Sequence, residues 1–487
     1  MDSMNMVIGD EKTMGSSDSW LEIVNPATEE VQARVPHAET RDVDMAVRAA
    51  RGAFEGAWGQ LTPSDRGRLL YRLVELIEKH ADALALLDTQ DMGKPYRHAR
   101  EHDVPMAVEF LRFYAGFCDK IRGSQVPCAP DKHVYLLREP VGVVAGVLPW
   151  NFPLVVAIQK LGPALACGNT LVLKPAEQSP RSALLLAELG LEAGLPPGVV
   201  NVVTGLGETT GAALVSHPGV DKISFTGSTD VGRIILRAAA DQIKKVTVEL
   251  GGKTANVIFA DADLEAALGW TLLTSCYNSG QICTTGSRLV VSRKVHDRFL
   301  DALISRMNKL KIGDPMQPDT KLGPLVSREQ FNRVKQYIAL GEKLYSPIVC
   351  GLRDHELNRG FYVNPTVFDH VDAGERIAQE EIFGPVLSVI DFDDDADAVR
   401  IANQTSYGLA TAIWTNDLSR AHRLAARMDS GFVWINCNNY WVSSIPYEGH
   451  RSSGVGVDMG TEVVESYTRL KSVIVNLDRT PQPWGGL

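Results

Sequence analysis

Apolar residues recur every three or four positions between residues 40 and 117, most clearly in 65–93 and 104–117. This spacing matches the 3.6-residue turn of an amphipathic helix. From about Val134 the pattern changes to short β-branched runs broken by Gly and Pro, which is typical of strands. The chain is therefore expected to begin mainly with helices and to continue into a sheet.

Strand-like and helix-like segments then alternate from residue 169 to residue 252, and again from 255 to 436. The first region predicts a doubly wound parallel sheet, and the second predicts another α/β domain. A chain of 487 residues has room for two or three such domains. The strand predicted at 472–477 either pairs with another subunit or closes a sheet of its own chain.

Composition and charge narrow the class of protein. The chain is 45% hydrophobic and 22% charged, as in globular enzymes, and its net charge of −10 argues against a general nucleic-acid binder. The apolar stretch 141–159 is interrupted by Pro149 and Pro153, so a buried strand followed by a loop is favoured over a membrane span. The N-terminus shows no secretory pattern, and a cytoplasmic location is expected.

The cysteines are odd in number, scattered, and form no C-x-x-C pair, so neither a disulfide framework nor a zinc site is expected, and no metal cofactor is predicted. Most should be small buried apolar residues, with one candidate for a reactive thiol. The seven are Cys118, Cys128, Cys167, Cys276, Cys283, Cys350 and Cys437.

Two strand ends have residues suited to a dinucleotide. In FTGSTDVG, 225–232, Gly227 allows a tight turn before a helix whose N-terminus favours phosphate, although a plain strand–turn–helix is an equal alternative. In VLKPAEQ, 172–178, Lys174 and Glu177 can bond ribose hydroxyls, and a carboxylate there would repel a 2′-phosphate and favour NAD. The alternative for this pair is a solvated ion pair on a loop.

Three further segments have residues suited to catalysis. Glu249 ends a strand before two glycines, where a desolvated carboxylate would be a general base. Cys283 lies among small polar residues, and a helix beginning at Thr284 would stabilise its thiolate. Asn151 can donate to an oxyanion. The alternatives are a surface glutamate, an inert buried cysteine and an asparagine that bonds its own loop.

Glu381 and Phe383 precede a Gly-Pro turn in EEIFGPV, 380–386. A carboxylate at this point can bind ribose hydroxyls, and an aromatic ring can form one wall for a nicotinamide. The alternative is a simple connection between a helix and a strand.

Six motifs stand in the order usual for aldehyde dehydrogenases: PWNFP, KPAEQ, FTGST, ELGGK, GQIC and EEIFGPV. Cys283 follows Glu249 by 34 residues, the usual interval in that family between nucleophile and base. The resemblance extends from Ile23 to Gly460. Through these residues the chain resembles the NAD(P)-dependent aldehyde dehydrogenase superfamily. The resemblance is to its hydrolytic members rather than to its acylating ones.

The resemblance implies an α/β fold in three parts. A variant Rossmann-like NAD-binding domain without the usual glycine fingerprint would comprise residues 1–120 and 141–251. A second α/β domain, 252–452, would be catalytic. A small β bridging element, 121–140 with 466–487, would join subunits into a homodimer or homotetramer.

The resemblance also implies a reaction. Cys283 attacks the aldehyde carbon to give a thiohemiacetal, whose oxyanion is held by the Asn151 amide and the backbone N–H of Cys283. Hydride transfer to the nicotinamide leaves a thioester, which water activated by Glu249 hydrolyses to the acid. NAD is the expected cofactor, with NADP less favoured.

By position, the cofactor would contact Trp150, Lys174, Glu177, Gly227, Ser228, Gly232, Leu250, Glu381 and Phe383. The substrate channel would be lined by Phe152, Gln159, Ile282, Thr284, Asn439, Trp441 and Tyr447. This set combines aromatic rings with amides, and it suggests an aromatic or medium-length aldehyde that carries a polar group. The alternative is that the amides bond each other or the backbone.

The chain departs from the family near its C-terminus. Members usually read P-F-G-G-x-K-x-S-G, whereas residues 446–454 read PYEGHRSSG, so Tyr447 replaces a Phe and Arg451 a Lys. A later Arg-Glu pair becomes Val457–Asp458. These changes affect the substrate side and a proton relay, and they leave the core chemistry in place.

Four alternatives remain open. His450 and Arg451 favour a carboxylate-bearing semialdehyde as substrate. A CoA-acylating member is disfavoured because Glu249 would be superfluous. A non-catalytic binding protein on the same fold is disfavoured because Cys283, Glu249 and Asn151 are present together. A Rossmann alcohol dehydrogenase needs no cysteine nucleophile.

Overall fold

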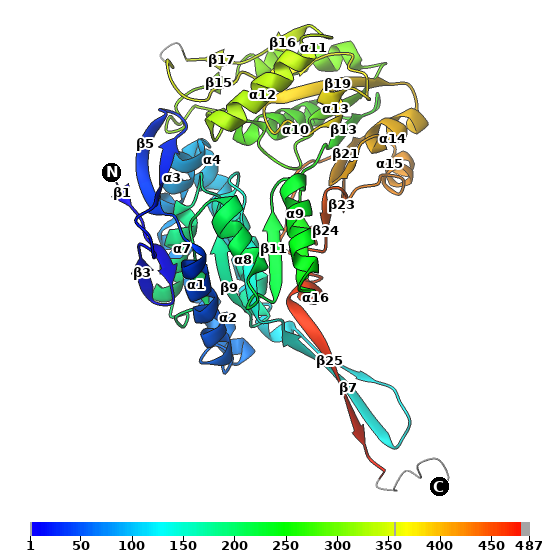
Figure 1. The fold of residues 1–487 in the computed structure, drawn as a ribbon. Helices are drawn as coiled ribbons and strands as arrows, with labels where there is room; N and C mark the ends of the chain where they lie inside the picture. Colours follow the sequence, from blue (N-terminus) through cyan, green and yellow to red (C-terminus); the bar gives the residue numbers. More distant parts are fainter. Residues whose placement is uncertain (1, 355–356, 479–487) are drawn as a thin grey trace.

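Two large β-sheets organise the chain, one in each of two α/β units (Figure 1). The structure is a computed structural model and describes residues 2–354 and 357–478. The first sheet has the strand order β24-β12-β11-β8-β9-β10-β2-β3, and the second has the order β16-β18-β19-β14-β13-β21-β22. The predicted α/β class is confirmed.

The first sheet has a parallel centre and antiparallel edges, as the alternating pattern predicted. Its central strands are β8 (Val143–Val147), β9 (Thr170–Lys174), β10 (Val200–Val202), β11 (Lys222–Thr226) and β12 (Lys245–Glu249). The edge strands are β2 (Met6–Ile8), β3 (Glu11–Thr13) and β24 (Gly454–Val455).

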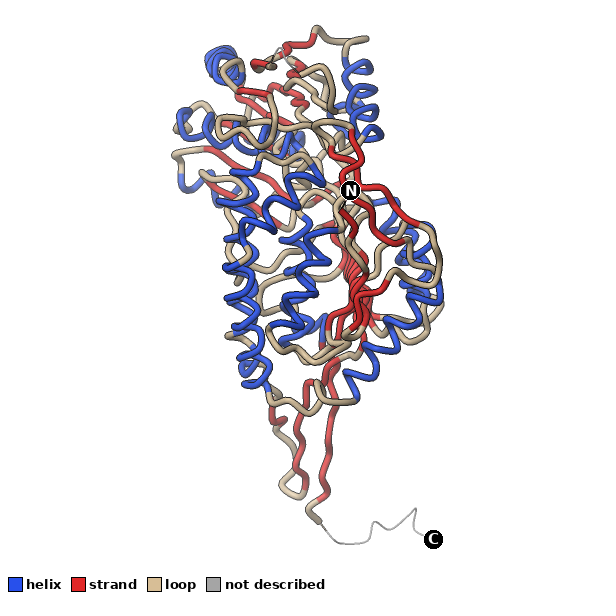
Figure 2. The backbone as a smooth tube through the Cα atoms, turned by 90° about the vertical axis from the view of Figure 1, so that its left-hand side faces the viewer, coloured by secondary structure: helices blue, strands red, loops and turns tan. Residues whose placement is uncertain are grey.

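Helices cover both faces of this sheet, which Figure 2 shows nearly edge-on. Along β8 and β9, Val144 and Leu171 point into one buried cluster, whereas Val143 and Val172 point into another. A sheet buried on both faces explains why its strands read as unbroken apolar runs. The helices are α1 (Thr40–Glu55), α2 (Pro63–Lys79), α3 (Ala81–Met92), α5 (Val104–Ala115), α6 (Pro153–Ala166), α7 (Arg181–Glu192), α8 (Ala212–Ser216) and α9 (Thr229–Ala240).

The second sheet is parallel except for β16 at its edge. Its strands are β13 (Ala255–Ile258), β14 (Arg288–Ser292), β16 (Pro347–Val349), β18 (Thr366–Phe368), β19 (Val386–Phe392), β21 (Ala410–Trp414) and β22 (Phe432–Ile435). The helices of this unit are α10 (Leu264–Cys276), α11 (His296–Met307), α12 (Arg328–Gly341), α13 (Arg376–Gln379), α14 (Asp395–Asn403) and α15 (Leu418–Ala425).

A three-stranded antiparallel arm projects from the body (Figures 1 and 2). It consists of β6 (Ser124–Val126), β7 (Lys132–Pro140) and β25 (Thr468–Asn476). The C-terminal strand pairs with β7 over its whole length, from Thr468↔Pro140 to Asn476↔Lys132. The C-terminal strand therefore closes a sheet of its own chain, while its contact with another subunit stays a prediction. Residues 479–487 of the predicted bridging element lie outside the described residues.

The apolar stretch 141–159 divides into strand β8, a short loop and the start of α6. Within residues 2–354 and 357–478, no helix has the length and apolar character needed to cross a membrane. The remaining short elements are β1 (Asp2–Ser3), β4 (Trp20–Asn25), β5 (Glu30–Pro36), α4 (Tyr96–His98), β15 (Lys311–Ile312), β17 (Leu352–Arg353), β20 (Tyr407–Gly408), β23 (His450–Arg451) and α16 (Val464–Tyr467).

Candidate active site

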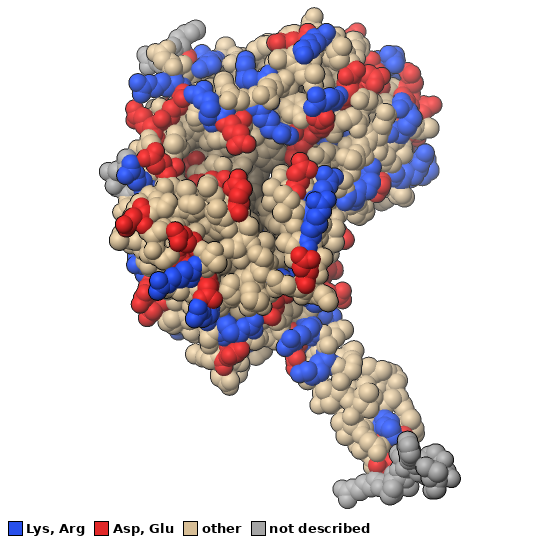
Figure 3. Space-filling view, viewed as in Figure 1, with Lys and Arg blue, Asp and Glu red and all other residues tan. Residues whose placement is uncertain are grey.

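A cavity of about 990 Å³ lies between the two α/β units, and Figure 3 shows this face of the molecule hollowed there. Its lining includes the three predicted catalytic residues Asn151, Glu249 and Cys283, and all seven predicted substrate residues. Six of the nine predicted cofactor residues also line it: Trp150, Gly227, Ser228, Leu250, Glu381 and Phe383. Lys174, Glu177 and Gly232 do not.

Asn151 lies in the loop that connects β8 to α6, and it is 6% exposed. Its Nδ2 donates to the carbonyl of Gln281 at 2.9 Å, while its own carbonyl accepts from Asn278 Nδ2 at 3.0 Å. The side-chain amide carries two hydrogens, and the bond to Gln281 uses one. The Asn151 loop and the Cys283 loop are thereby joined side by side.

The loop before Cys283 is a tight turn of three left-handed residues. Asn278 and Ser279 have φ of 50° and 55°, and a Cβ on Gly280 would lie 2.4 Å from the carbonyl oxygen of Gly384. Gln281 fixes the next position, since its Nε2 donates to Asn278 O and its Oε1 accepts from the N–H of Val326. The polar residues of the motif NSGQIC therefore position the loop that carries the thiol. This role was not predicted from the sequence.

No helix begins at Thr284, because Cys283 and Thr284 form a turn followed by an extended segment. The dipole stabilisation that such a helix would give the thiolate therefore does not apply. Burial raises the pKa of the Cys283 thiol to about 11, while a hydrogen bond with the Tyr447 hydroxyl at 3.2 Å works in the opposite direction. Cys283 is partly exposed, whereas Cys118, Cys167, Cys276 and Cys350 are buried.

Glu249 is the last residue of β12 and is 3% exposed, so the surface-glutamate alternative is wrong. Neither of its carboxylate oxygens has a hydrogen-bond partner within the part of the chain that the structure describes. Burial raises its pKa well above the usual range for glutamate, and the negative charge of Asp458 adds to the effect. In its deprotonated form, a buried carboxylate of this kind can take a proton from water.

A buried ion pair lies beside this carboxylate, formed by Lys160 of α6 and Asp458. Asp458 disfavours the charged form of Glu249, whereas Lys160 favours it. Asp458 was predicted only as a departure from the family pattern, and Lys160 was not among the predicted site residues. The available signal was one lysine inside the apolar helix PLVVAIQKLGPALA.

Glu381 lies over the glycine pair that follows Glu249. Its Oε1 accepts from the N–H of Gly252 at 2.9 Å, and a Cβ on Gly251 would lie 2.3 Å from its Oε2. Burial raises the pKa of Glu381 to about 7. Phe383 meets Trp150 edge-on, with ring centroids 5.2 Å apart. The motif EEIFGPV thus connects α13 to β19 and also forms one wall of the cavity.

The motif FTGSTDVG connects β11 to α9, as predicted, and residues 226–230 line the cavity. Ser228 is the N-cap of α9, and its hydroxyl accepts from the N–H of Val231 at 3.4 Å. Gly232 faces protein rather than the cavity, since a Cβ there would lie 2.4 Å from a methyl carbon of Leu250. Gly232 therefore permits close packing of the helix.

Lys174 and Glu177 lie at the C-terminal end of β9 and pair at 3.3 Å. The Lys174 side chain is only 3% exposed, so a solvated pair does not describe it. The two residues lie outside the cavity lining, at the end of the sheet where nucleotides bind in open α/β folds.

Trp441 and Tyr447 line the substrate side of the cavity, and the buried rings of Phe432 and Trp434 pack behind them. Centroids in this aromatic cluster lie 4.8–5.5 Å apart. Within the described residues the two amides bond neither each other nor the backbone, so that alternative does not describe them. Gln159 Nε2 contacts the sulfur of Met459 at 3.2 Å, and Asn439 Oδ1 accepts from the Thr284 hydroxyl. Asn439 Nδ2 is buried with no partner among the described residues.

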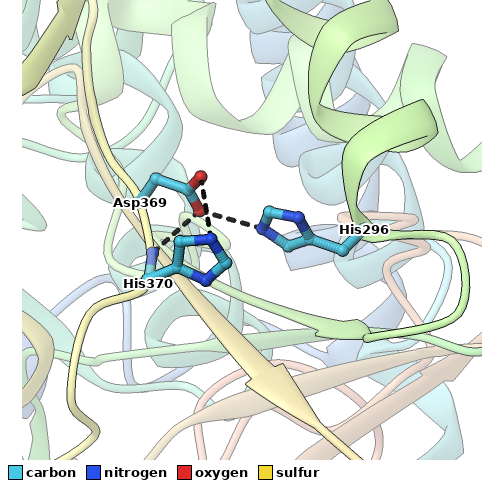
Figure 4. A group of neighbouring side chains, drawn as sticks. All are labelled: His296, Asp369 and His370. Atoms are coloured by element: carbon cyan, nitrogen blue, oxygen red, sulfur yellow. Dashed lines mark hydrogen bonds and ion pairs between the residues drawn. The ribbon is translucent and has the colours of Figure 1, made fainter.

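A second group of titratable side chains lies away from this cavity, at the start of α11 (Figure 4). His296 Nε2 lies 2.9 Å from Asp369 Oδ1, and His370 Nδ1 lies 2.7 Å from Asp391 Oδ2. The two imidazole rings stack at 4.7 Å with an interplanar angle of 19°, so their in-plane lone pairs do not converge on one point. Arg293 also binds Asp391 at 3.3 Å. The group is a network of hydrogen bonds between imidazoles and carboxylates, with one ion pair from Arg293 to Asp391.

Comparison with known proteins matches the aldehyde dehydrogenase family over residues 13–473. The chain belongs to the aldehyde dehydrogenase family. An aldehyde dehydrogenase of Emericella nidulans is 44% identical over 471 residues, which cover 96% of this chain and 94% of that protein.

Two solved relatives bound to NAD⁺ extend the comparison to the fold. An aldehyde dehydrogenase of Bacillus cereus in complex with NAD⁺ has a TM-score of 0.95 at 44% identity, and it covers 98% of this chain and 97% of its own. An indole-3-acetaldehyde dehydrogenase in complex with NAD⁺ has a TM-score of 0.95 at 42% identity, with 97% of each chain covered. The predicted enzyme class, an NAD-dependent aldehyde dehydrogenase, is confirmed.

Proposed function

We propose that this aldehyde dehydrogenase converts its aldehyde to the carboxylic acid through an acyl-enzyme on Cys283, with NAD as the hydride acceptor. The observation that supports this most is the meeting of Asn151, Glu249 and Cys283 on one cavity. They come from the end of β8, the end of β12 and the loop before β14. A partly exposed thiol, an amide donor and a buried carboxylate without partners are the groups that a thioester mechanism needs.

The first step is attack of Cys283 sulfur on the aldehyde carbon. The remaining N–H of the Asn151 amide and the backbone N–H of Cys283 hold the oxygen that becomes negative in the thiohemiacetal. The bond from Asn151 to Gln281 fixes the amide before substrate arrives, so no reorganisation is required when charge develops.

The residues around the cavity fit a dinucleotide, since the turn 226–230 at the start of α9 and the rings of Trp150 and Phe383 line the same cavity as Cys283. NAD, when bound, supplies the acceptor for the hydride that leaves the thiohemiacetal carbon. Glu381, Phe383 and Trp150 would hold the nicotinamide half. Ser228 and the N-terminus of α9 would face the diphosphate.

The last step is hydrolysis of the thioester. Glu249 takes a proton from water, the water oxygen adds to the carbonyl carbon, and the bond from carbon to sulfur breaks to release the acid. The raised pKa of Glu249 makes its carboxylate a stronger base than an exposed one. A CoA-acylating enzyme would not need this base.

For the substrate we propose an aromatic or medium-length aldehyde. The aromatic cluster of Phe432, Trp434, Trp441 and Tyr447 supports this, as does the relative named for indole-3-acetaldehyde. A carboxylate-bearing semialdehyde is disfavoured because His450 and Arg451 pair with Asp429 and do not line the cavity.

The arginines that line the cavity are also engaged, since Arg233 pairs with Asp230 and Arg333 donates to the carbonyl of Glu381. Steady-state kcat/KM for phenylacetaldehyde, hexanal and succinic semialdehyde tests the substrate proposal. The aromatic aldehyde is expected to give the highest value, and a preference for the semialdehyde would contradict the proposal.

Replacement of Glu177 by Gln is expected to raise the kcat/KM ratio of NADP to NAD by about tenfold. The substitution removes a negative charge that would lie near the ribose 2′ position of a bound cofactor, and such a charge would cost on the order of 1–4 kcal/mol against a phosphate. Initial rates with both cofactors measure the ratio. Glu192→Gln, on the exposed end of α7, is the matched control. An unchanged ratio in Glu177→Gln would show that another group selects the cofactor.

We further propose that residues 1–120 and 141–251 form the NAD-binding domain and that 252–452 form the catalytic domain. The bridging element, residues 121–140 with 466–487, contains the arm and is proposed to join subunits into a dimer or tetramer. Apolar side chains on the arm support its role, with Leu470 and Ile474 59% and 68% exposed. All seven cysteines are free, which supports a reducing compartment, and we propose the cytoplasm.

The arm proposal predicts that the double substitution Leu470→Asp with Ile474→Asp gives a smaller species than the parent protein by light scattering. Two carboxylates in an apolar interface remain unpaired, and their burial is costly. Leu418→Asp on α15, at a position 72% exposed, is the control and should leave the mass unchanged. A monomeric parent protein would refute the arm as an oligomerisation element.

A further inference from the structure

The hydroxyl of Tyr447 lies 3.2 Å from the sulfur of Cys283. Family members usually have Phe at this position, so the hydroxyl is a feature of this chain. We propose that Tyr447 is a catalytic residue that donates its phenolic hydrogen to Cys283 sulfur whenever the sulfur carries negative charge. The proposal rests on the proposed function of Cys283 and deepens it.

Two sets of contacts fix the position of the ring. Its face packs in the aromatic cluster, with centroids 5.1 Å from both Phe432 and Trp441. Its backbone pairs with Asp458, since the N–H of Tyr447 donates to the carbonyl of Asp458 at 2.6 Å and the reverse bond measures 2.8 Å. The hydroxyl is thus held at the sulfur by packing and backbone bonds and needs no substrate to place it.

The surroundings decide which atom donates. Burial and the negative charges of Cys283 and Glu249 raise the pKa of Tyr447 well above its usual range, so the phenol keeps its hydrogen at neutral pH. Once the Cys283 thiol has lost its proton, the sulfur has no hydrogen to donate, so it accepts from the phenol. The Tyr447 hydroxyl is therefore placed to donate a hydrogen bond to a thiolate at Cys283.

The other groups that face Cys283 make this donor important. Glu381 and Glu249 both disfavour a second negative charge, whereas the backbone N–H of Thr284 favours it. Beyond Glu249, Lys160 and Asp458 largely balance each other as an ion pair. Within the described residues, Tyr447 is the side chain that hydrogen-bonds the sulfur.

The sulfur is negative at two points of the proposed reaction. The thiol first loses its proton to water in the cavity, and the resulting thiolate accepts the bond from Tyr447 until it attacks the aldehyde carbon. Later the carbon–sulfur bond of the thioester breaks, and its electron pair returns to sulfur as thiolate. Between these points the sulfur is neutral, so hydride transfer gains nothing from the hydroxyl.

The test is Tyr447→Phe, which restores the residue usual in the family and removes one oxygen atom. Loss of a hydrogen bond to a charged acceptor raises the pKa of Cys283 by about one unit. The higher pKa lowers the thiolate fraction at neutral pH by about tenfold, and the greater nucleophilicity of a more basic thiolate offsets part of this loss. Alkylation of Cys283 by iodoacetamide at neutral pH should therefore slow by about threefold. Mass spectrometry of the labelled peptide assigns the rate to Cys283, and kcat should fall while NAD affinity is retained.

Tyr440→Phe is the matched control, since it removes a phenol 56% exposed in the same segment and should leave the alkylation rate unchanged. Removing an atom widens the channel, so a slower reaction cannot be a steric effect. An equal or faster alkylation rate in folded Tyr447→Phe, with folding checked by thermal unfolding, would overturn the proposal. Alkylation needs no turnover, so this outcome is distinct from failure of the proposed function, which activity in Cys283→Ala would reveal.

Discussion

Replacement of Cys283 by Ala is expected to abolish aldehyde oxidation, with kcat falling by about 10⁴-fold or more, because the thiol that lines the cavity is the nucleophile of the proposed reaction. Binding of NAD should persist, since the residues proposed to hold it are unchanged. Steady-state formation of NADH measures the first effect, and equilibrium dialysis measures the second. Loss of both would point to a folding defect rather than to loss of the nucleophile.

Cys128→Ala is the control for this experiment, because Cys128 is an exposed free thiol on the arm, outside the cavity lining. It should retain full activity. Incubation of the parent protein with aldehyde and NAD, followed by rapid acid quench, should give an acyl adduct on the peptide that contains Cys283. Near-normal turnover in Cys283→Ala would refute the thioester mechanism as a whole.

The order of elements could be predicted from local pattern. The helical period between residues 40 and 117 corresponds to α1, α2, α3 and α5, and the alternating segments correspond to the parallel strands of the first sheet. Both signals are set by burial of one or both faces, which a sequence records directly. The partner of the C-terminal strand was left open, since strand pairing between residues far apart leaves no local pattern.

The residues of the candidate site that belong to sequence motifs could be predicted from the sequence. Cys283, Glu249 and Asn151 lie on one cavity, yet the helix expected to stabilise the thiolate is absent. What acts on the sulfur in its place is a hydroxyl 164 residues further along the chain. The pairing of Lys160 with Asp458 also joins distant segments. Such contacts join segments that are far apart in the sequence, and no local pattern encodes them.

Replacement of Glu249 by Gln is expected to lower steady-state kcat by about 10²–10⁴-fold, the usual contribution of a general base. The first turnover should survive as a burst of NADH equal to the number of active sites, because attack and hydride transfer do not use this carboxylate. Stopped-flow absorbance measures the burst and the slow phase that follows it. Hydroxylamine, a nucleophile that needs no general base, should speed the slow phase.

The pH dependence of thioester hydrolysis follows from the raised pKa of Glu249. Burial and Asp458 raise the pKa of Glu249, and only its deprotonated form takes a proton from water. Thioester hydrolysis in the parent protein should therefore rise with pH up to that raised pKa and level off above it. Glu249→Gln should lose this ascending limb while the burst remains. A burst that disappears in Glu249→Gln would place the carboxylate in the first half-reaction instead, and an unchanged slow phase would assign water activation to another group.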